Sequence, residues 1–313
     1  MESHYYRYAG LRVASQLPIP EWSVFQQSAP FPKADVCIRL DRAPSWAGGP
    51  DQGAASHSIT RHEYCFHIPE AGHYRVRNGR EISVAPVAGV GEREVRLFLL
   101  GSAWGALCYQ RGILALHASV VEVGGSALAF CGPSGAGKSS IAAGLVARGG
   151  RLLSDDLCRF EIVDGVVSVH PSAPRLKLWR DALAGLGWRA DGLERDHFRV
   201  EKFHLPTPAS APPDKNEGLR ANARSVPLRA IYLLAWGDAD RMQLTGLKAL
   251  QGLVAAATYR GDLLEPMGEV ASHWQRCAVL AQRVPIRELR RPQDWSGMDK
   301  ALDLLLDCPE NRL

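Results

Sequence analysis

Apolar and polar residues alternate along much of the first third of the chain, a period of two that is typical of β-strands. Glycine-containing turns such as Arg77-Asn78-Gly79 separate the alternating runs. The segment Pro44–Ser56 is rich in Pro, Gly, Ala and Ser, which predicts a loop. We therefore expect a β-rich module, with strands over Tyr5–Val13, Ala34–Leu40, Glu63–Ile68, His73–Val76 and Glu81–Val84.

The pattern changes to a helical period between Glu92 and Gln110. Apolar residues then recur on one side, at Val95, Phe98, Leu99, Ala103 and Leu107. We expect a helix that connects a first module of residues 1–112 to a second module of residues 113–313.

The second module begins with a predicted hairpin. Leu114–Val123 and Ser126–Phe130 have the composition of strands, and Gly124-Gly125 between them is a good signal for a two-residue turn. The second strand leads directly into the sequence CGPSGAGKSS, and helical spacing follows over Ser140–Ala147.

The remainder is predicted to mix strands and helices. Gly149-Gly150 ends the preceding helix, and a short strand over Arg151–Leu153 finishes at Ser154-Asp155-Asp156. His197–Leu219 has four prolines and mixed charge, which predicts a long, mobile loop. Helices are expected over Leu178–Leu186, Leu247–Tyr259, Val270–Arg283 and Met298–Leu306, and strands over Leu228–Trp236 and Pro285–Leu289.

The composition is that of an ordinary globular protein, with 313 residues of which 46% are hydrophobic and 22% charged. A net charge of +4 without any long Lys/Arg run does not favour a nucleic-acid partner. The seven cysteines stand singly, which indicates reduced thiols rather than a disulfide framework or a zinc site. Neither a signal peptide nor an apolar stretch of membrane-spanning length is evident. We expect a soluble, cytoplasmic protein with no membrane partner.

The strongest chemical signal is a complete G-x-x-x-x-G-K-[ST] motif between a predicted strand and a predicted helix. Its glycines allow backbone N–H groups to surround a polyphosphate, and the helix points its positive end at the same anion. Lys138 would supply a positive charge to the β- and γ-phosphates, and the Ser139 hydroxyl would ligate Mg²⁺. The residues expected to bind a nucleoside triphosphate are Gly132, Pro133, Ser134, Gly135, Ala136, Gly137, Lys138, Ser139 and Ser140.

An adjacent pair of carboxylates, Asp155 and Asp156, follows after only one short helix. One of them could hold Mg²⁺ with Ser139, while the other accepts a proton from an attacking hydroxyl. The alternative interpretation is that Asp-Asp merely begins a turn after a strand. Its position after the phosphate-binding motif favours the functional interpretation.

These residues together resemble the catalytic domain of HPr kinase/phosphorylase. The similarity runs through Leu116-His117-Ala118-Ser119, GPSGAGKSS, Arg148-Gly149-Gly150 and Leu153-Ser154-Asp155-Asp156. The chain is more similar still to HPr-kinase-related kinases of peptide biosynthetic clusters, including the lasso-peptide kinases. That resemblance covers nearly the whole chain and is carried by YAGLRVASQLPIPE, LFLLGSAWGALCYQRGILALHAS, PRLKLW and VPIREL.

The resemblance implies an α/β, PEP-carboxykinase-like P-loop kinase domain with a β-rich N-terminal domain. It implies ATP and Mg²⁺ as cofactors, and a peptide serine, such as the C-terminal residue of a lasso-peptide precursor, as acceptor. The family's bacterial carrier kinases are hexamers, so self-association is consistent with it. Ser140 stands where the bifunctional enzymes usually have Glu, and their C-terminal phosphorolysis signature is not recognisable. Two alternatives remain open: a carrier-protein kinase/phosphorylase, and a nucleotide-dependent regulatory binding module.

The resemblance also implies site residues outside the motif. His117 would lie near the γ-phosphate beside Asp155, Asp156 and Lys138; its alternative role is that of a structural histidine at the start of an inner strand. Arg175 and Lys177 alternate with leucines and could face a phosphate or an acidic substrate, or simply form a solvated basic face. Weaker candidates for the same role are Arg260, Arg220 and Arg224.

Overall fold

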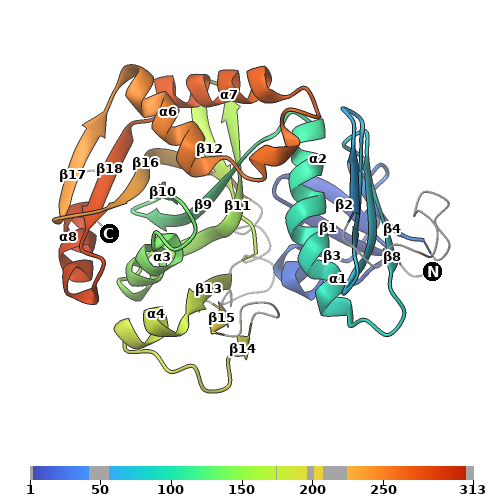
Figure 1. The fold of residues 1–313 in the computed structure, drawn as a ribbon, viewed down its shortest axis with the longest axis horizontal. Coiled ribbons are helices and arrows are strands. Elements are labelled where there is room, and N and C mark those ends of the chain that lie inside the picture. Colours follow the sequence, from blue (N-terminus) through green and yellow to red (C-terminus); the bar gives the residue numbers. More distant parts are fainter. Residues whose placement is uncertain (1–2, 42–55, 174, 196–200, 207–223, 308–313) are drawn as a thin grey trace. The chain divides into compact units, whose positions relative to one another are not determined.

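The computed structural model describes residues 3–41, 56–173, 175–195, 201–206 and 224–307. The chain divides into two compact units (Figure 1). The first comprises Met1–Ala115 and Tyr259–Trp274, and the second comprises Leu116–Thr258 and Gln275–Leu313. The segment Tyr259–Trp274 therefore belongs with the first unit, although it lies within the second predicted module.

The first unit contains an eight-stranded sheet in the order β3-β1-β2-β4-β8-β7-β6-β5. Tyr8 of this sheet stacks on Trp22, which lies outside the strands and meets Trp104 edge-on. The strands are β1 (His4–Tyr8), β2 (Leu11–Ser15), β3 (Gln26–Gln27), β4 (Val36–Leu40), β5 (Ser56–Ile59), β6 (Glu63–Ile68), β7 (Gly72–Arg77) and β8 (Glu81–Pro86).

The predicted strand over Tyr5–Val13 is wrong in one respect, because it is a hairpin rather than a single strand. Ala9 and Gly10 both have positive φ, at 47° and 72°, and this turn folds β2 back onto β1. The loop predicted over Pro44–Ser56 lies outside the described residues except for Ser56, the first residue of β5.

The helix predicted over Glu92–Gln110 is confirmed, with a local irregularity. It consists of α1 (Glu92–Phe98), a π-helical turn η2 (Leu99–Ala103) and α2 (Trp104–Gln110). Two glycines let the ring of Tyr259 approach this helix, because a Cβ at Gly105 would overlap the ring and one at Gly101 would lie close to its hydroxyl. The remaining short helices of this unit are η1 (Pro20–Phe25) and η4 (Gly261–Leu263).

The second unit is a mixed α/β structure around a seven-stranded sheet in the order β10-β9-β11-β12-β16-β18-β17, with β10 also paired to β16. The strands are β9 (Leu114–Val123), β10 (Ser126–Cys131), β11 (Arg151–Val163), β12 (Val166–His170), β16 (Val226–Trp236), β17 (Asp240–Leu244) and β18 (Ile286–Arg291). A separate small sheet has the order β13-β15-β14 and comprises β13 (Arg175–Trp179), β15 (Lys202–Pro206) and β14 (Glu194–Arg195).

Helices cover both faces of the seven-stranded sheet (Figure 1). Tyr232 and Leu234 of β16 belong to a buried cluster that also includes residues of α3, α4 and α8. Leu233 points the other way and meets α6, at Gly252. The helices are α3 (Lys138–Ala147), α4 (Arg180–Gly185), α6 (Gly246–Ala257), α7 (Val270–Arg283), η5 (Trp295–Gly297) and α8 (Met298–Leu306).

The hairpin predicted around Gly124-Gly125 is confirmed, as are the predicted helices that correspond to α3, α6, α7 and α8 and the strands that correspond to β16 and β18. The short strand expected over Arg151–Leu153 is wrong in its length, because β11 continues to Val163. Its second half pairs with β12, from Arg159 opposite His170 to Val163 opposite Val166. Pairing with a neighbouring strand therefore overrides the break that two aspartates suggest.

Two further expectations are corrected. The helix expected from Leu178 begins only at Arg180, because Arg175–Trp179 pairs with β15. The long loop expected over His197–Leu219 contains the strand Lys202–Pro206, and the rest of that segment apart from Glu201 lies outside the described residues. Within the described residues, every helix is too short or too polar to cross a membrane.

Candidate nucleotide and phosphoryl-transfer site

A strand, a glycine-rich loop and a helix form the centre of the candidate site. The loop follows β10, whose last residue is Cys131, and α3 begins at Lys138. Gly135 and Gly137 have φ of 87° and 91°, a region that favours glycine, so the motif's glycines are needed for this backbone path. Pro133, Ser134 and Gly135 are exposed, whereas Ala136 is buried. Ser139 and Ser140 belong to the first turn of α3, where backbone N–H groups have no helical partner.

Lys138 folds back onto the loop that precedes it. Its ammonium group donates hydrogen bonds to the carbonyl oxygens of Gly132 at 2.8 Å and Pro133 at 3.2 Å. Burial lowers the pKa of Lys138, and nearby acidic groups, Asp155 among them, only partly oppose this effect. A buried ammonium group that is held by carbonyl oxygens alone gains strongly from an anionic partner, such as a phosphate.

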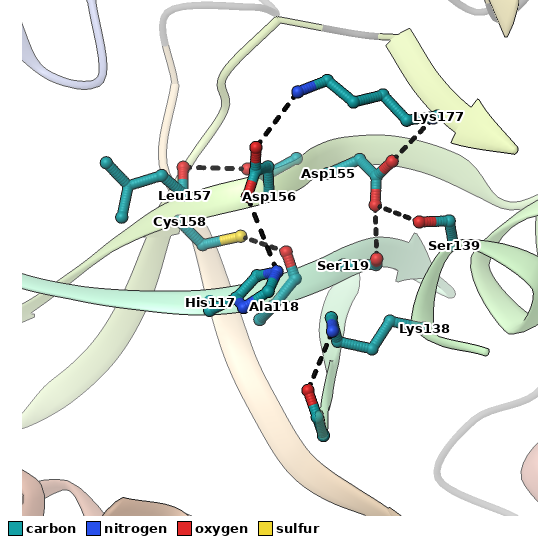
Figure 2. A network of polar contacts seen from close by, with 12 residues as sticks. His117, Ala118, Ser119, Lys138, Ser139, Asp155, Asp156, Leu157, Cys158 and Lys177 are labelled. Carbon is teal, nitrogen blue, oxygen red and sulfur yellow. Dashed lines mark hydrogen bonds and ion pairs between the residues drawn. The ribbon is translucent and has the colours of Figure 1, made fainter. Parts of the chain in front are cut away.

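Asp155 is held by hydrogen bonds to both of its carboxylate oxygens (Figure 2). The hydroxyls of Ser139, at 2.9 Å, and of Ser119 donate to Oδ1. The backbone N–H of Lys177 donates to Oδ2 at 2.9 Å. These contacts connect four elements, α3, β9, β11 and β13, so that the carboxylate is fixed next to the first turn of α3.

Asp156 faces a different set of groups. The Lys177 ammonium donates to its Oδ2 at 3.1 Å, and His117 Nε2 lies 3.5 Å from its Oδ1. Its φ of 119° is unusual for a residue other than glycine, and strained backbone of this kind is concentrated at functional sites. Burial raises the pKa of Asp156, but the positive charge of Lys177, which also donates a hydrogen bond, leads the effects that outweigh burial and hold the pKa below its ordinary value. The carboxylate is therefore ionised at neutral pH.

His117 and Ser119 lie on β9 two positions apart, so both point to the same side of the strand. His117 is half-buried, and desolvation lowers the pKa of its imidazole, an effect that Asp156 opposes and Lys138 reinforces. At neutral pH the ring is therefore uncharged and can both donate and accept a hydrogen bond beside Asp156.

The arrangement fits a magnesium ion that is shared with a phosphate. Mg²⁺ is commonly bound through one or two carboxylates, with phosphate oxygens and waters completing its shell. The hydroxyl of Ser139 and the carboxylate of Asp155, in contact at 2.9 Å, supply suitable oxygen ligands. No cluster of three or more His, Cys, Asp or Glu residues suited to a metal occurs in the described part of the chain.

The cations that were considered for substrate binding lie in different places. Lys177 is at the site, bound to Asp156. Arg175, two residues earlier on β13, is 3.7 Å from Glu194. Arg260 belongs to the first unit, where its guanidinium bonds to Asp262, Ser102 and Tyr64. Arg224 is exposed just before β16, and Arg220 lies outside the described residues.

Two groups at the site, the Ser119 hydroxyl and the backbone N–H of Lys177, were not predicted to have a role. Ser119 could have been found from the alternation of β9, which places it on the same side as His117. The backbone contact carries no sequence signal, since any residue at position 177 would supply it.

Comparisons with known proteins add little to this geometry. No protein-family model matches the sequence, and no curated protein matches it. The chain is similar to a solved structure of the HPr(Ser) kinase/phosphatase from Coxiella burnetii, with 13% sequence identity and a TM-score of 0.28. The match covers 53% of this chain and 99% of that chain. A TM-score this low assigns neither a fold nor a function.

Proposed function

We propose that this protein is an ATP- and magnesium-dependent kinase that transfers the γ-phosphoryl group to a hydroxyl. The observation that carries this proposal is the contact of Ser139, in the first turn of the phosphate-binding helix, with Asp155, the first of two adjacent carboxylates. Backbone N–H groups of the loop and the ammonium of Lys138 would bind the triphosphate. Ser139 and Asp155 would hold Mg²⁺, which supplies charge neutralisation at the phosphates when it is bound.

Asp156 is the proposed acceptor of the hydroxyl proton. Asp155 already accepts hydrogen bonds from two hydroxyls and a backbone N–H. These contacts fix its carboxylate in place, which suits Asp155 to holding Mg²⁺ rather than to accepting a proton. Asp156 is ionised, and it is oriented by Lys177 and by the uncharged ring of His117. The proton of the attacking hydroxyl would pass to Asp156 as the oxygen–phosphorus bond forms, and ADP would leave.

The finer assignments rest on the sequence resemblance. We propose that the second unit is a PEP-carboxykinase-like kinase domain. We propose a serine hydroxyl of a peptide as acceptor, such as the C-terminal serine of a lasso-peptide precursor. Arg175 remains a proposed contact for an acidic group of that peptide. Arg260, whose guanidinium is engaged within the first unit, is the weaker proposal for the same role.

Phosphoryl transfer from labelled ATP to serine-containing peptides tests the proposal. The wild-type protein is expected to label a peptide with a C-terminal serine, and Asp156→Asn to lower the rate by at least about a hundredfold, the usual contribution of a general base. Because the hydrogen bond and ion pairs of Asp156 are with Lys177 and His117, which lie outside the phosphate-binding loop, Asp156→Asn should still bind MgATP. If the wild-type protein binds MgATP but transfers phosphate to none of the peptides, the kinase assignment is contradicted. If Asp156→Asn keeps full activity, Asp156 is not the proton acceptor.

A further inference from the structure

The glycine-rich loop is flanked by a second set of side chains, those at the carboxyl ends of β16 and β18, on the side away from the two aspartates. β10, β16 and β18 run parallel, and their carboxyl ends are Cys131, Trp236 and Arg291 (Figure 1). Trp236 and Arg291 are direct partners across the strands. Ligands of parallel α/β sheets bind beyond these carboxyl ends. On the opposite edge of β10 lies β9, which carries His117, and next to β9 lies β11, which carries the two aspartates.

Arg291 is a buried cation beside the loop. Its exposed fraction is 5%, and its Nε is buried without a hydrogen-bond partner. Nη1 donates to the carbonyl of Pro292 at 3.0 Å, and a Cβ at Gly137 would collide with Nη2. No ion pair joins Arg291 to a carboxylate among the described residues, although the more distant charge of Asp294 acts on it. Leaving a guanidinium buried without an anion is costly, so the position suits a cation whose anion arrives with a ligand.

Trp236 also packs against that guanidinium. The Arg291 carbon Cζ is 4.4 Å from the centroid of the indole, which is a cation–π arrangement. Trp236 nevertheless remains 42% exposed. A guanidinium that covers one ring face and fixes the indole leaves the rest of the ring available for stacking.

We propose that Arg291 and Trp236 form the nucleoside end of the site: the guanidinium binds the phosphate nearest the ribose, and the indole stacks on the base. This inference rests on the proposed function, because it needs a nucleotide in the loop. It fixes the direction of the nucleotide, with the reacting phosphate toward Asp155 and Asp156 and the base toward β16 and β18. Stacking alone does not read the base edges, so ATP and GTP bind with similar affinity.

The test is equilibrium binding of ATP, GTP and inorganic tripolyphosphate, each with Mg²⁺, to the full-length protein. Trp236→Ala is expected to weaken ATP and GTP by the same factor, about tenfold, and to leave tripolyphosphate unchanged. Trp236→Phe keeps a stacking ring and retains most of the affinity. Arg291→Gln weakens all three ligands. Trp274→Ala is the control and is expected to leave all three affinities unchanged, because Trp274 is similarly exposed, at 38%, and lies on α7, outside the strands that carry the site.

The outcomes separate this inference from the proposed function. Failure of tripolyphosphate to bind the wild-type protein overturns the phosphate site itself, and this inference with it. Tripolyphosphate binding with unchanged ATP and GTP affinities in Trp236→Ala overturns the nucleoside site alone. A loss for one nucleotide but not the other overturns recognition by stacking. Circular dichroism of Trp236→Ala and Trp236→Phe establishes that both variants are folded.

Discussion

Lys177 is the residue that connects the two carboxylates of the candidate site. Its backbone N–H donates to Asp155, and its side chain donates to Asp156. Attraction to Asp156 raises the pKa of Lys177, against the effect of burial. The two partners thus keep one another charged. Since one contact uses the backbone and the other the side chain, a substitution at this position can remove the second without the first.

The pH dependence of activity tests that pairing. The pKa of Asp156 is lower in the folded protein than its ordinary value of 3.8. The ionised carboxylate therefore stabilises the folded state above pH 3.8, and this contribution is lost as the pH falls through the lowered pKa. Lys177→Met removes the nearest positive charge while keeping the N–H to Asp155, so the pKa of Asp156 rises. We expect the acid limb of kcat/KM to move to higher pH in this variant.

The control for this experiment is Lys248→Gln, which removes an exposed charge on α6. It is expected to leave the acid limb in place. An acid limb that is the same in Lys177→Met and in the wild-type protein would show that Asp156 does not control it.

At the level of single residues, much of the candidate site could be predicted, for a physical reason. The phosphate-binding motif can be recognised from the sequence because its glycines and Lys138 lie within one continuous segment, residues 132–139. The contact of Asp155 with Ser139 could be anticipated only as a hypothesis. Arg291 could not be found, because its position beside Gly137 depends on strand pairing across the sheet rather than on a local pattern.

At the level of elements, the helix that carries Lys138 is held by its packing against α8. Gly144 of α3 faces Leu302 of α8, and a Cβ at Gly144 would lie 2.7 Å from the Leu302 Cδ1. Both helices also contribute to the buried cluster that covers one face of the seven-stranded sheet. The position of the phosphate-binding helix therefore depends on a close contact that only glycine permits without adjustment.

We expect Gly144→Ala to lower the free energy of unfolding by about 1–3 kcal/mol through overpacking, although alanine is the better helix former. Urea denaturation followed by circular dichroism measures this change. In a Leu302→Ala background the cost of Gly144→Ala should be much smaller, since the colliding methyl group is gone. Equal costs in the two backgrounds would show that this contact does not limit the packing.

Elements were predictable where the signal was local. The turn at Gly124-Gly125 has positive φ at both residues, which glycine accommodates without strain, so the hairpin followed from the sequence. β11 was predicted too short, because its continuation past Asp156 depends on pairing with β12. The helix predicted from Leu178 was started two residues too early for the same reason, since β13 extends to Trp179 by pairing with β15, which lies within a segment predicted to be a loop.

At the level of the whole molecule, a segment late in the sequence belongs to the first unit, although it is flanked on both sides by segments of the second unit. Tyr259–Trp274 belongs to the first unit, where the Tyr109 hydroxyl bonds to the Tyr259 carbonyl. The period of apolar residues relates only positions that are close in the sequence. It therefore does not show that Tyr259–Trp274 packs with a unit formed mainly by residues 1–115. The boundary near residue 113 was indicated by a change from helical to strand periodicity, which is a local signal.

We propose that the second unit binds a magnesium nucleotide through the loop of residues 132–139, and the other assignments depend on this binding. Isothermal titration calorimetry with MgATP measures this most directly, on the wild-type protein, on Lys138→Ala and on the exposed-lysine control Lys300→Ala. We predict saturable binding to the wild-type protein and to Lys300→Ala, and at least about a tenfold weaker affinity for Lys138→Ala, which loses a charge-assisted phosphate contact. The absence of saturable heat from the folded wild-type protein at millimolar MgATP, or equal affinities for Lys138→Ala and the wild-type protein, would contradict it.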